Sequence, residues 1–133
     1  MKETNLKFEI RFYEGVLEHK PDFIQALMAL ADCYTRDGQH EKGLVLDKQL
    51  SQLRPEDPYI LYNLSCSYSL LNQVDKAFET MKLAIDGGYD DFRFLAKDQD
   101  LENLRNDQRF REYLLQFKNK RVFDQNPDLK THP

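Results

Sequence analysis

The side chains that could perform catalysis or hold a metal ion are few and widely spaced in this sequence. His19, His40 and His132 lie far apart, and none has the partner four residues away that a helical zinc site needs. Cys33 and Cys66 form no Cys-x-x-Cys pair, so we expect two free thiols, with a disulfide or a metal site as the alternative. We therefore predict no metal site and no cofactor.

The serines and the acidic residues also lack the context of a catalytic site. Ser65, Ser67 and Ser69 are not part of the Gly-x-Ser-x-Gly sequence that exposes a nucleophilic serine on a sharp turn. Pairs of acidic residues precede expected helices, where carboxylates cap free backbone N–H groups. These pairs are Glu56-Asp57, Asp90-Asp91 and Asp98 with Asp100. Gly87-Gly88 follows a helix and precedes no Lys-Ser or Lys-Thr, so it is not a phosphate loop. We predict that the chain is not an enzyme.

The composition argues against two classes of partner. The net charge of −4 disfavours nucleic acid, because its phosphates are neutralised by lysine and arginine. No run approaches the roughly 20 apolar residues of a membrane span, so we expect no membrane association. The N-terminus has no apolar leader, which predicts a cytoplasmic protein.

Apolar residues recur at intervals of three and four along most of the chain, which predicts an all-α fold. Helices are expected at about 5–19, 23–37, 41–53, 58–71 and 74–86. An alternating pattern at 6–12 is the one strand-like feature, and it is isolated. Asp22 and Asp57 are the expected N-caps of the second and fourth helices. Gly38 supplies the left-handed residue that ends the second helix.

Two of the expected helix pairs share one pattern at a fixed offset. Leu27, Leu30, Tyr34, Gly43 and Leu50 lie 34 residues before Leu61, Leu64, Tyr68, Ala77 and Ala84. An offset that holds over five positions indicates an internal repeat. The short turn within each pair predicts that its two helices are antiparallel neighbours.

The period and the pattern resemble those of the tetratricopeptide repeat (TPR) family, whose unit is two antiparallel helices. In the second unit, the signature positions are filled by Leu64, Ser65, Tyr68, Ala77, Met81 and Ala84. The first unit departs from the family, because Gly43, Asp47 and Leu50 replace an alanine, a large apolar residue and a second alanine. The resemblance implies a TPR-like α-α superhelix of antiparallel helix pairs with a C-terminal helical cap.

The resemblance also implies the organisation of the chain. We expect a single helical domain over residues 1–119, followed by a tail. Its parts are a half unit at 6–21, repeats at 24–57 and 58–91, and a cap at 92–119 like that of many such proteins. The cap covers the apolar face of the last repeat. Residues 120–133 are predicted to be extended or disordered, or else docked through Val122 and Phe123.

For function, the resemblance implies a non-catalytic adaptor that binds a peptide or a partner subunit on the concave face of its repeats. Carried over position by position, that face consists of Gln25, Met28, Asp32, Thr35, Arg36, Tyr59, Tyr62, Asn63, Cys66 and Ser69. Packing on the neighbouring helix is the alternative role of Tyr62. Some members of the family clamp the terminal carboxylates of heat-shock chaperones here. Asp32 would repel a carboxylate, so we reject that clamp.

A structural or self-assembling subunit of a larger complex is the second hypothesis. The N-terminal helix is half a unit, so one of its apolar sides has no partner in the sequence. Phe8 and Phe12 lie on this helix, where they either serve as a cap or pack against another chain in a homo-oligomer.

Overall fold

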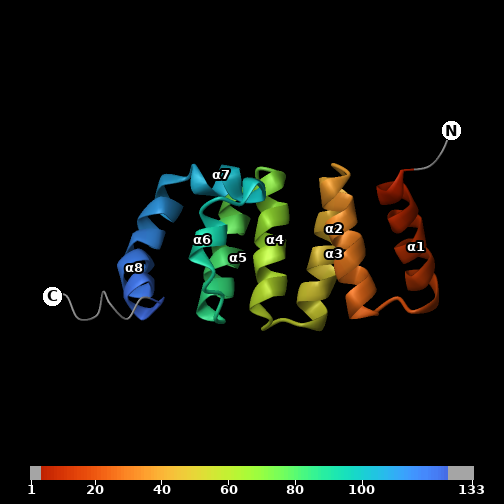
Figure 1. Ribbon diagram of the computed structural model, residues 1–133, viewed down its shortest axis with the longest axis horizontal. Helices are drawn as coiled ribbons and strands as arrows, with labels where there is room; N and C mark the ends of the chain where they lie inside the picture. Colours follow the sequence, from red (N-terminus) through yellow and green to blue (C-terminus); the bar gives the residue numbers. More distant parts are fainter. Residues whose placement is uncertain (1–3, 126–133) are drawn as a thin grey trace.

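The computed structural model describes the backbone of residues 4–125 and the side chains of residues 4–117. This part of the chain is all helical and contains no strand. Its helices are α1 (Asn5–His19), α2 (Ile24–Arg36), α3 (His40–Leu53), α4 (Pro58–Leu70), α5 (Val74–Asp86), α6 (Phe92–Leu95), the 3-10 helix η1 (Gln99–Leu101), α7 (Glu102–Arg105) and α8 (Gln108–Gln125) (Figure 1). The all-α prediction is confirmed, and the five long helices agree with their expected bounds to within one residue.

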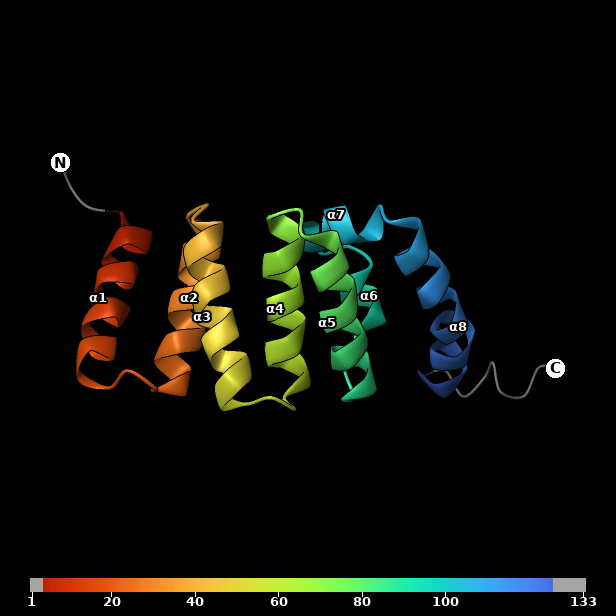
Figure 2. The same ribbon diagram turned by 180° about the vertical axis from the view of Figure 1, so that it is seen from behind.

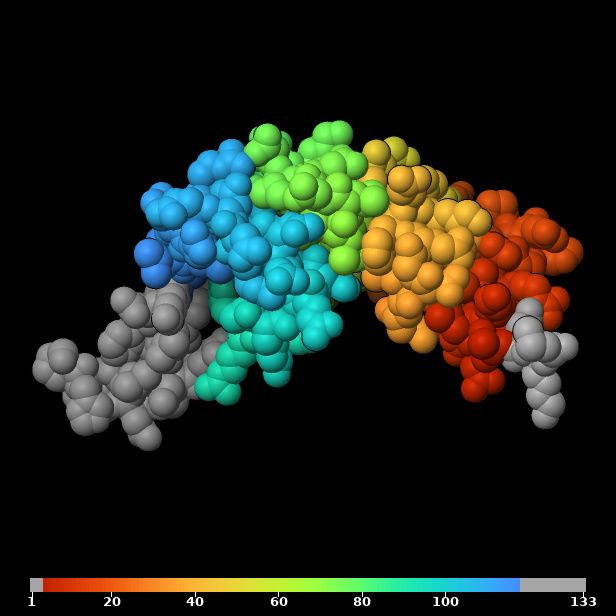
Figure 3. All heavy atoms as spheres, turned by 90° about the horizontal axis from the view of Figure 1, so that it is seen from above, coloured from red at the N-terminus to blue at the C-terminus, as the bar shows by residue number. Residues whose placement is uncertain are grey.

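The helices form adjacent packed pairs in two rows. The helix α2 packs on α3, and α4 packs on α5, while α1 packs on α2. The front row in Figure 1 contains α2, α4 and α6, and the view from behind in Figure 2 shows α3 and α5 in front. Seen from above, the stack is bent into an arch with one hollow side (Figure 3). This arrangement is consistent with a helical repeat.

The turns within the two pairs repeat at the offset of the sequence pattern. Gly38 ends the first helix of one pair with φ +79°, the left-handed conformation that was expected of it. Asn72 takes the same position 34 residues later with φ +59°, which asparagine tolerates better than most residues. Gly88 closes α5 with φ +114°.

The N-caps confirm one prediction and correct another. The Asp57 carboxylate accepts hydrogen bonds from the backbone N–H groups of Tyr59 (2.9 Å) and Ile60 (3.2 Å). Asp22 does not cap α2, because the cap residue is Phe23, one position later. The Asp22 carboxylate instead accepts a hydrogen bond from Gln49 Nε2 at 3.1 Å. This bond joins the start of α2 to α3.

The core between α4 and α5 depends on small residues that let the two helices approach. Ala77 and Ala84 are fully buried there with Met81. Ser65 is also fully buried, and its hydroxyl donates to the carbonyl oxygen of Ala77 at 2.7 Å. A buried hydroxyl needs such an acceptor, since leaving it unpaired would be destabilising.

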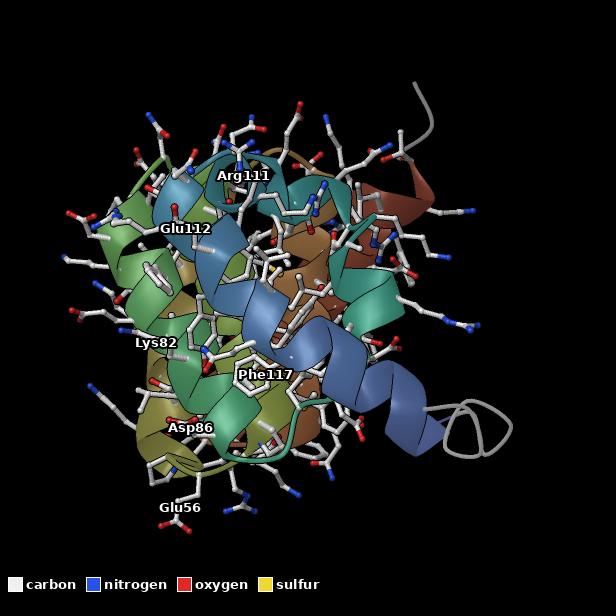
Figure 4. All side chains as sticks on the ribbon, turned by 90° about the vertical axis from the view of Figure 1, so that its left-hand side faces the viewer. Glu56, Lys82, Asp86, Arg111, Glu112 and Phe117 are labelled. Atoms are coloured by element: carbon white, nitrogen blue, oxygen red, sulfur yellow. The ribbon has the colours of Figure 1, made fainter. Side chains whose placement is uncertain are left out.

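The C-terminal segments cover the end of this core. Leu95, Leu101, Leu104 and Phe110 are fully buried against it. In Figure 4, α8 lies across this end of the stack, and the labelled Phe117 belongs to the side chains packed on the same core.

The helix α8 continues to Gln125, so the expected extended tail does not begin at residue 120. The segment 120–125 contains no proline or glycine that would end a helix. The first such residue is Pro127, which disfavours the helical conformation of the residue before it. Residues 126–133 and the side chains of Val122 and Phe123 lie outside what the structure describes.

Candidate partner-binding site

A pocket of about 210 Å³ lies between α2, α4 and the segment from α6 to η1. It opens on the hollow side of the arch in Figure 3. Six of the ten residues expected on the concave face line it. These are Met28, Asp32, Thr35, Tyr62, Asn63 and Cys66. The pocket therefore brings together residues of α2 and α4.

Tyr62 forms a wall of the pocket and holds the C-terminal cap in place. Its hydroxyl donates a hydrogen bond of 2.6 Å to Asp98 Oδ2. Its ring stacks on Tyr89 with centroids 4.3 Å apart and lies 6.2 Å from the ring of Phe94. Burial, with the charge of Asp98 nearby, raises the pKa of the Tyr62 phenol, so the hydroxyl keeps its proton and remains a donor. Only 5% of Tyr62 is exposed, so packing is its main role.

Four carboxylates line the pocket, and those of Asp100 and Asp32 are close enough to influence each other. Burial is the largest cause of the raised pKa of Asp100, and the negative charges of Asp98 and Asp32 add to it. The charge of His40 acts in the opposite direction. Asp32 comes from α2 and Asp100 from η1, so the pocket gathers negative charge from both of its sides.

Asp47 reaches the same pocket from α3. Its side chain is only 4% exposed, and Ser67 Oγ donates to its Oδ2 at 2.5 Å. Burial raises the pKa of Asp47 to about 6, although the hydrogen bond from Ser67 lowers it. Ser67 is itself buried, so this pair joins α3 to α4 and offers no accessible nucleophile.

Comparison with known proteins identifies a relative of the chain. The chain is 34% identical over 120 residues to a chloroplastic protein of Arabidopsis thaliana. The match covers 88% of this chain and 34% of the relative, so the chain spans about a third of that protein's length. No family model matches the chain.

Four of the expected residues do not line the pocket. Gln25 is exposed on α2. Arg36 donates to Asp32 at 2.9 Å and also to Glu9, which joins α2 to α1. Tyr59 is exposed beside the pocket, with its ring centroid 5.8 Å from that of Tyr89.

The prediction for Ser69 is corrected by the cap. Ser69 is fully buried, and its hydroxyl oxygen accepts a hydrogen bond of 3.1 Å from the backbone N–H of Leu104. Its carbonyl oxygen accepts another from Asn103 Nδ2 at 2.8 Å. The helix α7 thus occupies the place where a partner was expected to contact Ser69.

Residues of the cap were missed as parts of the site. Phe94, Asp98 and Asp100 all line the pocket, although the sequence pattern assigned both carboxylates to helix capping. Asp98 does cap η1, since it accepts from the backbone N–H of Asp100 at 3.0 Å. No hydrogen bond to the Asp100 carboxylate comes from the residues with described side chains. The Asp-x-Asp sequence formed by Asp98 and Asp100 was the one feature that could have pointed to these pocket carboxylates.

The two cysteines lack the character of reactive nucleophiles. Both cysteines are free and buried, and burial raises the pKa of the Cys66 thiol, which keeps it protonated and weakly nucleophilic. Within residues 4–117, no cluster of three or more histidine, cysteine or acidic side chains is arranged to hold a metal ion. None of the helices in the described part has the length and apolar character needed to cross a membrane.

Proposed function

We propose that this chain is a TPR module that acts as a non-catalytic adaptor. It binds a peptide or a partner subunit in the pocket on its concave face. Three features support this assignment: the 34-residue offset of the sequence pattern, the packed adjacent helix pairs, and the position of the pocket. In this proposal the repeats are residues 24–57 and 58–91, and α1 is the second half of an earlier unit.

The observation that carries the proposal is the pairing of exposed apolar side chains with polar groups in one pocket. Met28 from α2 is 38% exposed, and Phe94 from the cap is 45% exposed. Asn63 and Thr35 supply polar groups to the same pocket. A concave surface with apolar anchors and a few polar groups is typical of binding sites. Tyr59, exposed beside it, would extend the contact area.

The compartment stays a prediction. The sequence pattern predicts the cytoplasm, whereas the name of the Arabidopsis relative places that protein in the chloroplast. We propose a cytoplasmic adaptor, and a fluorescent fusion of the full-length protein expressed in its own cells tests this assignment.

Truncation of the two apolar anchors should weaken binding without unfolding the protein. Peptides selected from a random library against the full 133-residue chain serve as the probe. We expect Met28→Ala with Phe94→Ala to lower the affinity for these peptides by about tenfold or more, because each buried apolar side chain contributes about 1.5–3 kcal/mol. Fluorescence anisotropy measures the affinity, and circular dichroism checks the fold.

The matched control truncates two other exposed apolar residues. Val45 on α3 and Leu83 on α5 are both exposed and neither lines the pocket. We expect Val45→Ala with Leu83→Ala to bind the selected peptides like the unchanged chain. Equal affinity of all three proteins would show that the concave pocket is not the binding site.

Self-association through α1 is a second candidate function. Phe8 and Phe12 lie one turn apart on α1 and are 57% and 56% exposed. If they form a contact between copies, the protein is a dimer or larger assembly at high micromolar concentration, and Phe8→Ser with Phe12→Ser makes it a monomer. Size-exclusion chromatography with light scattering measures the mass. A monomeric unchanged chain contradicts this candidate.

A further inference from the structure

The side chains that line the concave pocket carry charge of one sign. Asp32 comes from α2, Asp47 from α3, and Asp98 and Asp100 from the cap. Every lining residue is among those with described side chains, and none of them is lysine, arginine or histidine. The negative charge is therefore not balanced within the pocket wall itself.

The arginines that touch this region are already engaged. Arg36 pairs with Asp32 at 2.9 Å and with Glu9 of α1 at 3.3 Å. Arg105 donates to the backbone carbonyl oxygens of Leu95 and Asp98 and forms no described ion pair with a pocket carboxylate. Asp32 thus has one cationic partner, whereas Asp98 and Asp100 have none among the ion pairs that the described side chains form.

Asp100 is the carboxylate best placed to receive a cation. It is half-buried, it does not cap a helix, and no described side chain donates a hydrogen bond to it. Burial and the charges of Asp98 and Asp32 raise its pKa, which means that its negative form is destabilised where it lies. A positive group within about 4–6 Å would stabilise that form.

The apolar side chains beside the carboxylates restrict which kind of cation can fill the pocket. Met28 and Phe94 are exposed beside the carboxylates, so a ligand that fills the pocket needs an apolar part as well as a charged end. Lysine and arginine combine these two parts, because their aliphatic stems pack on apolar surface while the charged end stays polar. The Phe94 ring can also attract the cation through its face. A bare metal ion uses only the carboxylates, and within the described side chains these are not arranged to hold one.

We propose that the pocket accepts a lysine or arginine side chain of the bound segment. Its stem lies between Met28 and Phe94, and its charged end lies against Asp100 and Asp32. This inference rests on the proposed function, since it names the residue type by which a partner is recognised in the same pocket.

The test uses the random-library peptides selected on the full chain. We expect them to be enriched in lysine or arginine and to lose affinity when that residue is replaced by leucine. Asp100→Asn should lower the affinity for these peptides about tenfold or more, because a charge-assisted hydrogen bond contributes about 1.5–3 kcal/mol. Raising the salt concentration from about 0.1 M to about 1 M should also lower the affinity of the unchanged chain for these peptides, since the screening length falls from about 10 Å to about 3 Å.

A matched control separates the local charge from the net charge. Glu79 is exposed on α5 and does not line the pocket, so Glu79→Gln removes one negative charge elsewhere. We expect Glu79→Gln to leave the affinity unchanged.

Two outcomes overturn the inference in different ways. If the peptides depend on Met28 and Phe94 but are not basic, or bind Asp100→Asn as tightly as the unchanged chain, the inference is wrong and the proposed function stands. If no selected peptide depends on Met28 and Phe94, the proposed function fails and the inference fails with it.

Discussion

Replacement of Phe110 by alanine is expected to lower the free energy of unfolding by about 3–5 kcal/mol. Phe110 is fully buried, and its ring meets that of Phe78 edge-on with centroids 5.7 Å apart. Tyr113 packs beside both rings. Because small domains are stable by only about 5–15 kcal/mol, this loss is a large part of the total.

Urea unfolding followed by circular dichroism measures this effect. Leu115 lies on the same helix as Phe110 but is exposed, so Leu115→Ala is the matched control and should change the free energy by at most about 0.5 kcal/mol. If Phe110→Ala and Leu115→Ala unfold at the same urea concentration, α8 does not stabilise the domain. The role of the cap in covering the last helix pair would then be wrong.

The cap also connects stability to the proposed site. Phe94, Asp98 and Asp100 form one side of the pocket, and they precede the helix that Phe110 anchors. Asp98 is bonded to Tyr62 of α4, so displacement of the cap would remove both the charge and the apolar anchor on that side. The pocket therefore depends on the cap for its geometry as well as for its chemistry.

Local signals in the sequence were sufficient to predict the long helices. Their period is visible in any short window, and Gly38 and Asp57 act at their ends within a few residues of their own position. Asp22 shows the limit of this reasoning, because its carboxylate bonds to Gln49, 27 residues away, in place of the nearby N–H groups. A side chain with two possible partners is assigned only when the packing is known.

The sequence pattern selected residues of α2 and α4 for the candidate site, and it could not select those of the cap for a similar reason. The fixed offset relates the expected concave positions of one repeat to those of the next, and Met28, Asp32 and Tyr62 from this set line one pocket. The cap has no such offset. Its contacts with α4 join residues 36 positions apart for Tyr62 and Asp98, and no periodic pattern encodes that distance. The burial of Ser69 under α7 was missed in the same way.

Asp47 is expected to make the protein less stable at neutral pH than in mild acid. Its pKa is raised from 3.8 to about 6, mainly by burial, whereas in the unfolded chain the carboxyl group has its ordinary pKa. Between about pH 4 and about pH 6, the folded state therefore holds a proton that the unfolded state has released. Its contribution to stability is fully present below about pH 4 and is lost as the pH rises through about 6.

Asp47→Asn should therefore raise the free energy of unfolding at pH 7 by up to about 3 kcal/mol, which corresponds to a pKa shift of about two units. The asparagine oxygen can still accept the hydrogen bond from Ser67. Urea unfolding at a series of pH values from about 4 to about 7 measures the effect. The slope of the free energy of unfolding against pH should be shallower in Asp47→Asn. It should not vanish, because the pKa of Asp100 is raised as well. Glu79→Gln removes an exposed carboxylate and is the control for the loss of one negative charge.

The same variant connects stability to recognition. A buried carboxylate that destabilises the folded protein at pH 7 is expected where its charge serves binding. If Asp47 contributes to the field that attracts a basic side chain, Asp47→Asn will bind the selected basic peptides more weakly although it is the more stable protein. Equal stability of the two proteins at pH 7 would show that the Asp47 carboxylate is not destabilised by its burial. A gain in stability with unchanged peptide affinity would limit the role of Asp47 to its bond with Ser67, and Asp32 and Asp100 would then carry the recognition of the cation.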